Sequence, residues 1–173
     1  LHSFPTRRSS DLPFAGYDMP VQYPLGVMKE HLHCRAKAGL FDVSHMGQVI
    51  LRAPGGHAAV AQAMAGLVPV DLLGQGVMRQ RYGMFTNDAG GILDDLMLAN
   101  RGDHMFVVVN AACKAADIAH MRAGLPGIEV AEITDRALLA LQGPAAEVVL
   151  AGLVPGVAAM RFMDVGIFES TFG

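Results

Sequence analysis

A turn-rich segment at residues 87–91 (NDAGG) separates two runs of strand-forming residues, and it constrains the fold more than any other part of the chain. The runs on either side, 78–86 and 92–99, are rich in apolar residues. A connection of this length with two glycines is typical of a β-hairpin with a bulge. The second run carries two adjacent carboxylates, Asp94 and Asp95. Because strand side chains alternate between faces, we expect one carboxylate to point toward a covered face of a sheet.

A carboxylate on an apolar face needs a partner. Away from water an ionised carboxylate is costly unless it accepts hydrogen bonds or its pKa shifts. A polar ligand could supply the donor, which makes the pair a candidate ligand-anchoring or catalytic site. The alternative is that the two carboxylates cap the hairpin or accept hydrogen bonds from nearby backbone N–H groups. Strand geometry alone leaves both interpretations open.

The composition is that of a chain able to bury a substantial core. Of the 173 residues, 52% are hydrophobic and 17% are charged, which argues against disorder. The net charge of -3 and the lack of a Lys/Arg cluster in the body give no basis for binding nucleic acid. Apolar runs are interrupted well before the ~18 residues of a membrane span. Cys34 and Cys113 do not make a disulfide framework, so we expect a reducing compartment, the cytoplasm or an organelle matrix.

The two ends of the chain differ from its body. Residues 1–12 lack an initiator Met, share no periodicity with the rest of the chain, and are interpreted as a foreign or disordered segment. Their Arg and Ser content could mimic an organelle transit peptide, but the segment is short and contains Asp11. At the other end, residues 168–173 have the pattern of part of a strand. We therefore expect residues 13–173 to form an incomplete domain.

The remaining pattern predicts an α+β fold with mainly antiparallel sheets and flanking helices. Residues 67–76 are expected to form a loop. Helices are predicted at 26–37, 57–65 and 111–123, with a further helix beginning at Pro144. Besides the hairpin, strands are predicted at 43–53, 104–110, 128–133 and 137–142.

Two polar clusters resemble catalytic or metal-binding motifs, but their spacing does not favour either. In the segment HLHC at 31–34, neighbouring positions of a helix point in different directions, and no second Cys/His group stands at zinc spacing. We therefore predict no metal site. Asp42, Ser44 and His45 lie within four positions, whereas a catalytic triad is assembled with defined geometry from separated positions. A turn in which Asp42 and Ser44 bond to local backbone is favoured.

Other side chains could complete a site around Asp95. Tyr82 lies in the strand before the hairpin turn, and Asn110 follows the apolar strand 105–109. An Asn at that point commonly caps the next helix, but its amide could also lie beside Asp95. An amide opposite a carboxylate would match a ring that carries both donors and acceptors, as a pterin does. Most of the methionines are expected to fill the core.

Five segments together resemble the T-protein of the glycine cleavage system, aminomethyltransferase. They occur in the family's order and with similar spacing, and the resemblance covers the chain from about Pro13 to Gly173. It implies a tetrahydrofolate enzyme that takes an aminomethyl group from the lipoyl arm of the H-protein, releases ammonia and leaves 5,10-methylenetetrahydrofolate. The segments are 14–23 (FAGYDMPVQY), 39–47 (GLFDVSHMG), 90–96 (GGILDDL), 108–111 (VVNA) and 140–144 (ALQGP).

The resemblance also assigns roles to residues. Asp95 matches the family's key carboxylate, which holds and polarises the folate so that a ring nitrogen can attack the methylene carbon. Asn110 matches a pterin-contacting amide, Tyr82 a ring-contacting tyrosine and Met46 a residue of the pocket wall. Met97 is added because it shares a strand face with Asp95. The resemblance thus implies one catalytic residue, Asp95, within a folate-binding set of five.

Two features limit what the resemblance implies. Asp94 would lie on the opposite face of the strand and be structural. The family continues beyond this chain, with a Thr-Gly-Tyr-Thr-Gly-Glu-type segment and an arginine-bearing segment that complete folate binding and do not occur here. We therefore expect this chain alone to bind folate weakly or not at all and to show no turnover.

The expected cellular location is the cytoplasm, or the mitochondrial matrix if the source is eukaryotic.

Two alternatives to the T-protein remain. One is the folate-binding part of a sarcosine or dimethylglycine dehydrogenase relative, and the other is a non-catalytic folate-binding module. The segment VSHMG at 43–47 favours the T-protein over the first. The presence of Asp95 favours catalysis over the second.

Overall fold

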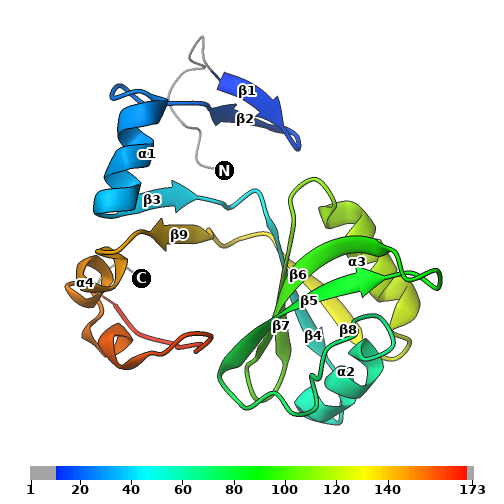
Figure 1. The fold of residues 1–173 in the computed structure, drawn as a ribbon. Coiled ribbons are helices and arrows are strands. Elements are labelled where there is room, and N and C mark those ends of the chain that lie inside the picture. The colour runs from blue at the N-terminus through cyan, green and yellow to red at the C-terminus, as the bar shows by residue number, and fades with distance from the viewer. Residues whose placement is uncertain (1–10, 171–173) are drawn as a thin grey trace. The chain divides into compact units, whose positions relative to one another are not determined.

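The computed structural model describes residues 11–170, which form two compact units (Figure 1). One unit contains residues 11–45 and 137–158, and the other contains residues 46–136 and 159–170. All five residues predicted to bind folate belong to the second unit. Each unit is therefore described separately.

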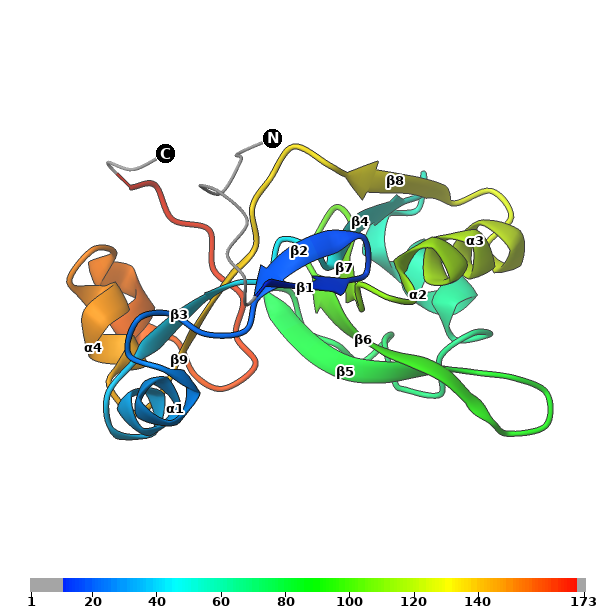
Figure 2. The same cartoon turned by 90° about the horizontal axis from the view of Figure 1, so that it is seen from above.

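The second unit is built on a five-stranded antiparallel sheet with the strand order β5-β6-β7-β4-β8. β5 and β6 form the predicted hairpin, a long curved ribbon in Figure 2. Its register shifts between Phe85 and Thr86, which confirms the predicted bulge. The strands are β4 (Gly47–Arg52), β5 (Arg79–Thr86), β6 (Ile92–Asn100), β7 (Met105–Val109) and β8 (Glu129–Ile133).

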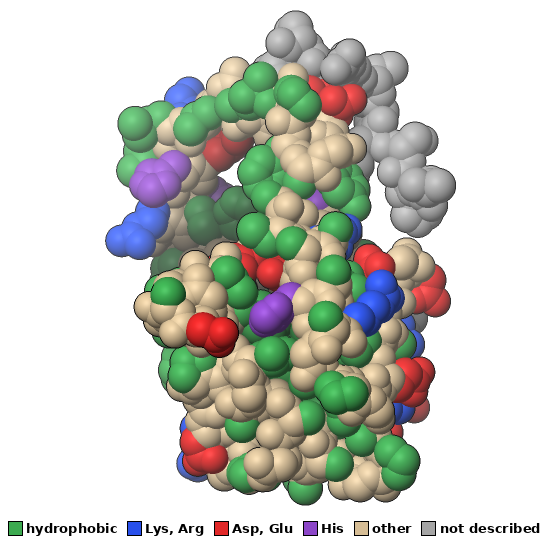
Figure 3. Space-filling view, turned by 90° about the vertical axis from the view of Figure 1, so that its right-hand side faces the viewer, with side chains coloured by type: hydrophobic (Ala, Val, Ile, Leu, Met, Phe, Trp, Pro, Cys, Tyr) green, Lys and Arg blue, Asp and Glu red, His purple; other side chains and the backbone are tan. Residues whose placement is uncertain are grey.

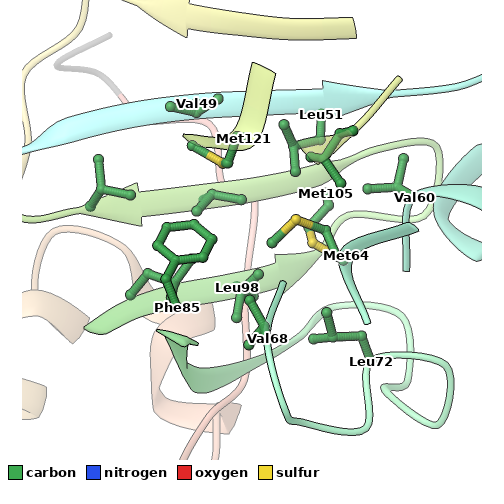
Figure 4. Close-up of a cluster of buried hydrophobic side chains, with 14 of the residues drawn as sticks. Val49, Leu51, Val60, Met64, Val68, Leu72, Phe85, Leu98, Met105 and Met121 are labelled. Carbon is green, nitrogen blue, oxygen red and sulfur yellow. The ribbon is translucent and has the colours of Figure 1, made fainter. Parts of the chain in front are cut away.

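One face of this sheet is covered by α2 (Gly56–Met64), α3 (Lys114–Gly124) and the loop at 67–76. Alternate strand residues point into the resulting core, as Figure 4 shows for Val49 and Leu98. Burial of each such side chain contributes about 1.5–3 kcal/mol. The core side chains with 0% of their surface exposed are Val49, Leu51, Val60, Ala61, Met64, Phe85, Leu98, Met105, Val107, Val109 and Met121.

The first unit contains two small antiparallel sheets. In one, β1 (Asp11–Phe14) pairs with β2 (Tyr17–Pro20), and in the other β3 (Gly39–Asp42) pairs with β9 (Leu139–Gln142). Its helices bury none of their residues. The helical segments are α1 (Val27–Ala36), α4 (Ala146–Ala151) and the 3-10 helix Pro155–Ala159. The last residue of this 3-10 helix already belongs to the second unit.

The predicted α+β class, with antiparallel sheets and flanking helices, is confirmed. The predicted helices and the loop at 67–76 are present, although α3 begins three residues later than expected and α4 two residues after Pro144. The strand expected at 43–53 begins only at Gly47, because residues 43–46 form a turn in which the Ser44 N–H donates to Asp42 Oδ1 (2.9 Å).

The two ends also differ from expectation. Asp11 and Leu12, assigned from the sequence to the foreign segment, are part of β1, where Leu12 pairs with Met19. The rest of that segment, 1–10, lies outside the described residues. Residues 168–170 form no strand, and 171–173 lie outside the described residues. The nearby backbone instead follows the edge of β5, where Asp164 forms an isolated bridge with Arg79 and an ion pair with its guanidinium.

The surface carries mixed charge. Figure 3 shows acidic and basic side chains scattered among hydrophobic and other groups on one face. Both cysteines are free. Among the described residues, no helix is long and apolar enough to cross a membrane.

Leu98 tests the assignment of the covered face. Replacing this fully buried side chain by Ala should lower the free energy of unfolding by about 2–5 kcal/mol, because it leaves a cavity between β6 and the helices. Leu93→Ala is the matched control, since Leu93 lies in the same strand with 49% of its surface exposed. Denaturant unfolding measures both variants. Equal losses would show that the covered face has been assigned wrongly.

Candidate functional site

The strand register brings two predicted site residues together on the face of the sheet away from the helices. Tyr82 pairs with Met97 across β5 and β6, and Met97 pairs with Val108 of β7. Cross-strand partners share a face. On β6 the neighbouring residues Leu96 and Leu98 point into the core, so Met97 points away from it. Tyr82 is 62% exposed.

The next row along the same face contains the carboxylate. Asp95 pairs with Met84 of β5, and Asn110 directly follows β7 at the position opposite Asp95, since Leu96 pairs with Val109. The Asn110 amide nitrogen donates to Asp95 Oδ1 (3.0 Å) and to the Asp95 backbone carbonyl (3.1 Å). Met46 directly precedes Gly47, whose partner is Val109. The pairing thus gathers all five predicted residues beside the start of β4 and the end of β7, with Tyr82, Asp95 and Met97 inside β5 and β6.

A hollow of about 220 Å³ opens on this face. Its lining residues are Tyr82, Gly83, Met84 and Asp95, so Met46, Met97 and Asn110 lie near it without lining it. Pockets that enclose a whole drug-sized ligand measure about 300–1,000 Å³. The hollow can therefore receive part of a flat molecule and leaves the rest uncovered by the described residues of this unit.

Asp94 occupies the opposite side of β6. It is half-buried and pairs with Phe85, whose side chain is fully buried in the core. The Asn110 amide also reaches this carboxylate, with 3.1 Å between Nδ2 and Asp94 Oδ1. One amide therefore holds both members of the aspartate pair, and such bonds to a carboxylate are stronger than those between neutral groups.

Two further ionisable groups lie beside Asp94 at the start of α3. The pKa of Asp117 is raised to about 7, first by burial, and then by a hydrogen bond with the Asp94 side chain and by the charges of Asp94 and Asp95. The negative charge of Asp94, followed by burial, raises the pKa of the Cys113 thiol. The thiol is thus less reactive than an ordinary one.

The capping alternative for Asn110 is wrong. The residue at the N-cap of α3 is Cys113, and no side chain there makes a capping hydrogen bond. Asn110 precedes the helix by too many residues to reach its first N–H groups, and its amide is engaged by the two carboxylates.

Comparison with known proteins identifies the group to which this chain belongs. The GCVT N-terminal domain family matches residues 7–170.

The chain belongs to this family.

Its relatives are aminomethyltransferases. The chain is 41% identical over 163 residues to the mitochondrial aminomethyltransferase of Dictyostelium discoideum, covering 88% of this chain and 40% of that protein. It is 39% identical over 164 residues to the human mitochondrial aminomethyltransferase, covering 90% of this chain and 40% of that protein. The crystal structure of glycine cleavage system aminomethyltransferase T from Bartonella henselae aligns with a TM-score of 0.80 at 39% identity, over 89% of this chain and 42% of that one.

These matches confirm both the resemblance to the T-protein and the T-protein-like fold. The chain spans about two fifths of the length of the relatives that it matches. The activity of those whole proteins is therefore not shown by the match.

The two polar motifs that the sequence did not favour as sites lie at residues 31–34 and 42–45 of this GCVT chain. His31 and His33 are exposed on α1, and the described residues contain no group of three or more potential metal ligands. Ser44 Oγ accepts the Leu138 N–H (2.9 Å). Its hydrogen bonds to Asp42 lower the pKa of that carboxyl. His45 packs edge-on against the Phe14 ring at 5.7 Å. The predicted turn is confirmed for Asp42, which accepts the Ser44 N–H, but the Ser44 hydroxyl bonds to the distant backbone of Leu138 and not to local backbone.

Sequence reasoning missed Asp117 and Met84. Asp117 lies on the buried face of α3 with Ile118 and Met121, and a carboxylate on the apolar side of a helix was the signal that could have revealed it. Met84 lies two residues after Tyr82, so strand alternation places both on one face. Gly83 between them faces the core, where a Cβ would lie 2.6 Å from Leu98 and Val68 side-chain atoms.

The raised pKa of Asp117 predicts a pH-dependent stability. The unfolded chain loses the Asp117 proton near pH 3.8, whereas the folded chain keeps it up to about pH 7. Raising the pH through this window therefore favours unfolding. Asp117→Asn should remove that slope, so that the stability of the variant relative to the parent rises by about 2 kcal/mol between about pH 5 and about pH 7.5. Denaturant unfolding at each pH measures it.

Asp88→Asn is the control for this prediction, because Asp88 is exposed in the hairpin turn. Its unfolding free energy should follow that of the parent across the same pH range. Parallel curves for the parent and Asp117→Asn would contradict the prediction.

Proposed function

We propose that this chain is the N-terminal part of a tetrahydrofolate-dependent aminomethyltransferase of the glycine cleavage system. The enzyme takes the aminomethyl group from the lipoyl arm of the H-protein, releases ammonia and forms 5,10-methylenetetrahydrofolate. The observation that carries the proposal is the strand register, which gathers Tyr82, Met97, Asp95 and Asn110 at one end of an open sheet face. Membership of the GCVT N-terminal domain family and aminomethyltransferase relatives at about 40% identity support it.

The residues present suit a pterin ring. Asp95 is exposed and keeps acceptor capacity beyond the bond from Asn110, so its carboxyl can accept hydrogen bonds from ring N–H groups. Tyr82 and Met84 border the hollow with apolar surface, which suits the face of a flat ring. Met46 would contribute to the wall of the folate site beyond Asn110, and Met97 would lie under the bound ring.

Tetrahydrofolate, when bound, supplies the ring nitrogen that accepts the methylene carbon, and 5,10-methylenetetrahydrofolate results. In the proposal Asp95 holds and polarises the folate so that this nitrogen is oriented toward the carbon. Asn110 keeps the Asp95 side chain from rotating away, because it bonds to both the carboxyl and the backbone carbonyl. In balance, two carbon–nitrogen bonds to the folate would form while the carbon–sulfur bond to the lipoyl arm and the carbon–nitrogen bond to the leaving ammonia would break. The two folate N–H protons would leave with the lipoyl thiol and with ammonia.

The size of the hollow explains why we expect this chain alone to bind folate weakly. With about 220 Å³ open on one side, it provides one wall of a site, so we expect weak folate binding and no turnover by the 173-residue chain. A test of catalysis therefore needs the chain inside a longer protein.

A chimaera provides that test. This chain replaces the matching 163 residues of the Dictyostelium aminomethyltransferase, and ammonia release from the aminomethyl-lipoyl H-protein is measured with tetrahydrofolate. Asp95→Asn in the active chimaera should lower turnover by about 10²-fold or more, because the amide cannot provide the carboxylate charge. Asp88→Asn serves as the matched control.

Folate binding to the same variants separates two roles. Lost turnover with folate still bound supports a catalytic Asp95, whereas turnover within twofold of the parent would contradict the proposal. An active Asp95→Asn variant would favour a folate-binding module in which this carboxylate has no part in the chemistry.

A further inference from the structure

Two buried carboxyl oxygens under the candidate site lack a donor. Asp94 Oδ2 and Asp117 Oδ2 are both inaccessible to solvent, and neither has a hydrogen-bond partner among the described residues. Asp117 as a whole is only 4% exposed. Buried acceptors of this kind are uncommon in folded proteins, and each one needs an explanation.

A shared proton explains both oxygens at once. Two carboxylates that both ionise at short range repel each other in a buried space, whereas one proton between them turns an acceptor–acceptor contact into a hydrogen bond. The side chains of Asp94 and Asp117 are within hydrogen-bonding reach of each other, and the pKa of Asp117 is raised to about 7, chiefly by burial. The surroundings thus favour the protonated form at neutral pH and below.

The same Asp94 carboxyl is connected to the candidate site. Its other oxygen, Oδ1, accepts the bond from the Asn110 amide at 3.1 Å, and that amide also bonds to Asp95 Oδ1 at 3.0 Å. The contacts run from Asp117 through Asp94 and Asn110 to Asp95. An amide placed between two carboxylates is sensitive to how either one is oriented.

We propose that Asp117 is a positioning residue, which shares one proton with Asp94 and thereby holds the Asn110 amide against Asp95. Only the consequence for catalysis rests on the proposed function, since the proton and the amide geometry exist without folate. When the shared proton is lost, two negative carboxylates face each other, Asp94 turns away, and Asn110 loses one of its two side-chain acceptors.

The neighbouring ionisable groups come from two elements. Asp94 and Asp95 face Asp117 from β6. Cys113 lies one turn earlier at the start of α3, where the Asp94 charge, burial, a hydrogen bond with the Asp94 side chain and, last, the Asp117 charge raise the pKa of its thiol. His120 lies on the next turn of α3, where its ring packs edge-on against Phe85 at 5.0 Å. Deprotonation of Asp117 therefore adds a negative charge beside the carboxylates of Asp94 and Asp95.

Carbon-13 NMR of the chain labelled at its Asp carboxyl carbons tests the proposal without any ligand. One carboxyl signal should titrate with a midpoint near pH 7, displaced from the ordinary value near 4, and it should be absent from Asp117→Asn. The side-chain amide signals of Asn110 should shift with the same midpoint. Asp88→Asn should leave both titrations unchanged.

Two variants separate positioning from a merely structural role. Asn at position 117 can donate to Asp94 without a titrating proton, so Asp117→Asn should keep the Asn110 amide signals at their low-pH position across the whole range. Asp117→Ala removes the donor and should place them at the high-pH position throughout. Should the Ala variant not fold, Asp117→Asn and the parent titration still decide the question.

The proposal is overturned if every Asp carboxyl titrates in the ordinary range, or if the Asn110 amide signals do not follow the raised titration. Because no folate is present, these outcomes are independent of the chimaera's activity. Within an active chimaera, Asp117→Asn should lose the part of the pH profile of turnover that the parent shows near pH 7.

Discussion

The alternation of side chains along β6 is the constraint on which the second unit depends. Leu96 and Leu98 fill the core beneath the helices, so Met97 between them and Asp95 before them must face the open side of the sheet. A one-residue slip of the register would exchange these faces and expose the core. The burial of the two leucines therefore fixes where Asp95 points, and the hydrophobic effect that folds the unit also orients its candidate catalytic group.

The aspartate pair lies at the boundary between the core and the open side of the sheet. Asp95 is exposed at the hollow, whereas Asp94 lies against the buried start of α3. Asn110 can reach both because β7 ends at Val109 and no longer commits its next side chain to the sheet. The amide therefore couples a solvent-facing carboxylate to a buried one across the thickness of a strand.

Local pattern was enough to predict the hairpin, its bulge and the opposite faces of the aspartate pair, because alternation and turn chemistry act within a few residues. The nearness of Asn110 to Asp95 was predictable as one of two alternatives, since Asn110 follows β7 and Asp95 lies in the neighbouring strand β6. Asp117 was not, because its burial depends on where α3 docks on the sheet, which is set by contacts distant in sequence. The strand expected at the end of the chain was wrong for residues 168–170, which form no strand.

In the proposed function the open face of the sheet, and not the covered one, receives the folate. Methyl NMR of the chain labelled at its methionines, titrated with tetrahydrofolate to high concentration, tests it most directly. We expect shifts at Met84 and Met97, with Met64 and Met105 in the core and exposed Met28 on α1 unchanged. Shifts confined to Met28 or to the core methionines would contradict it.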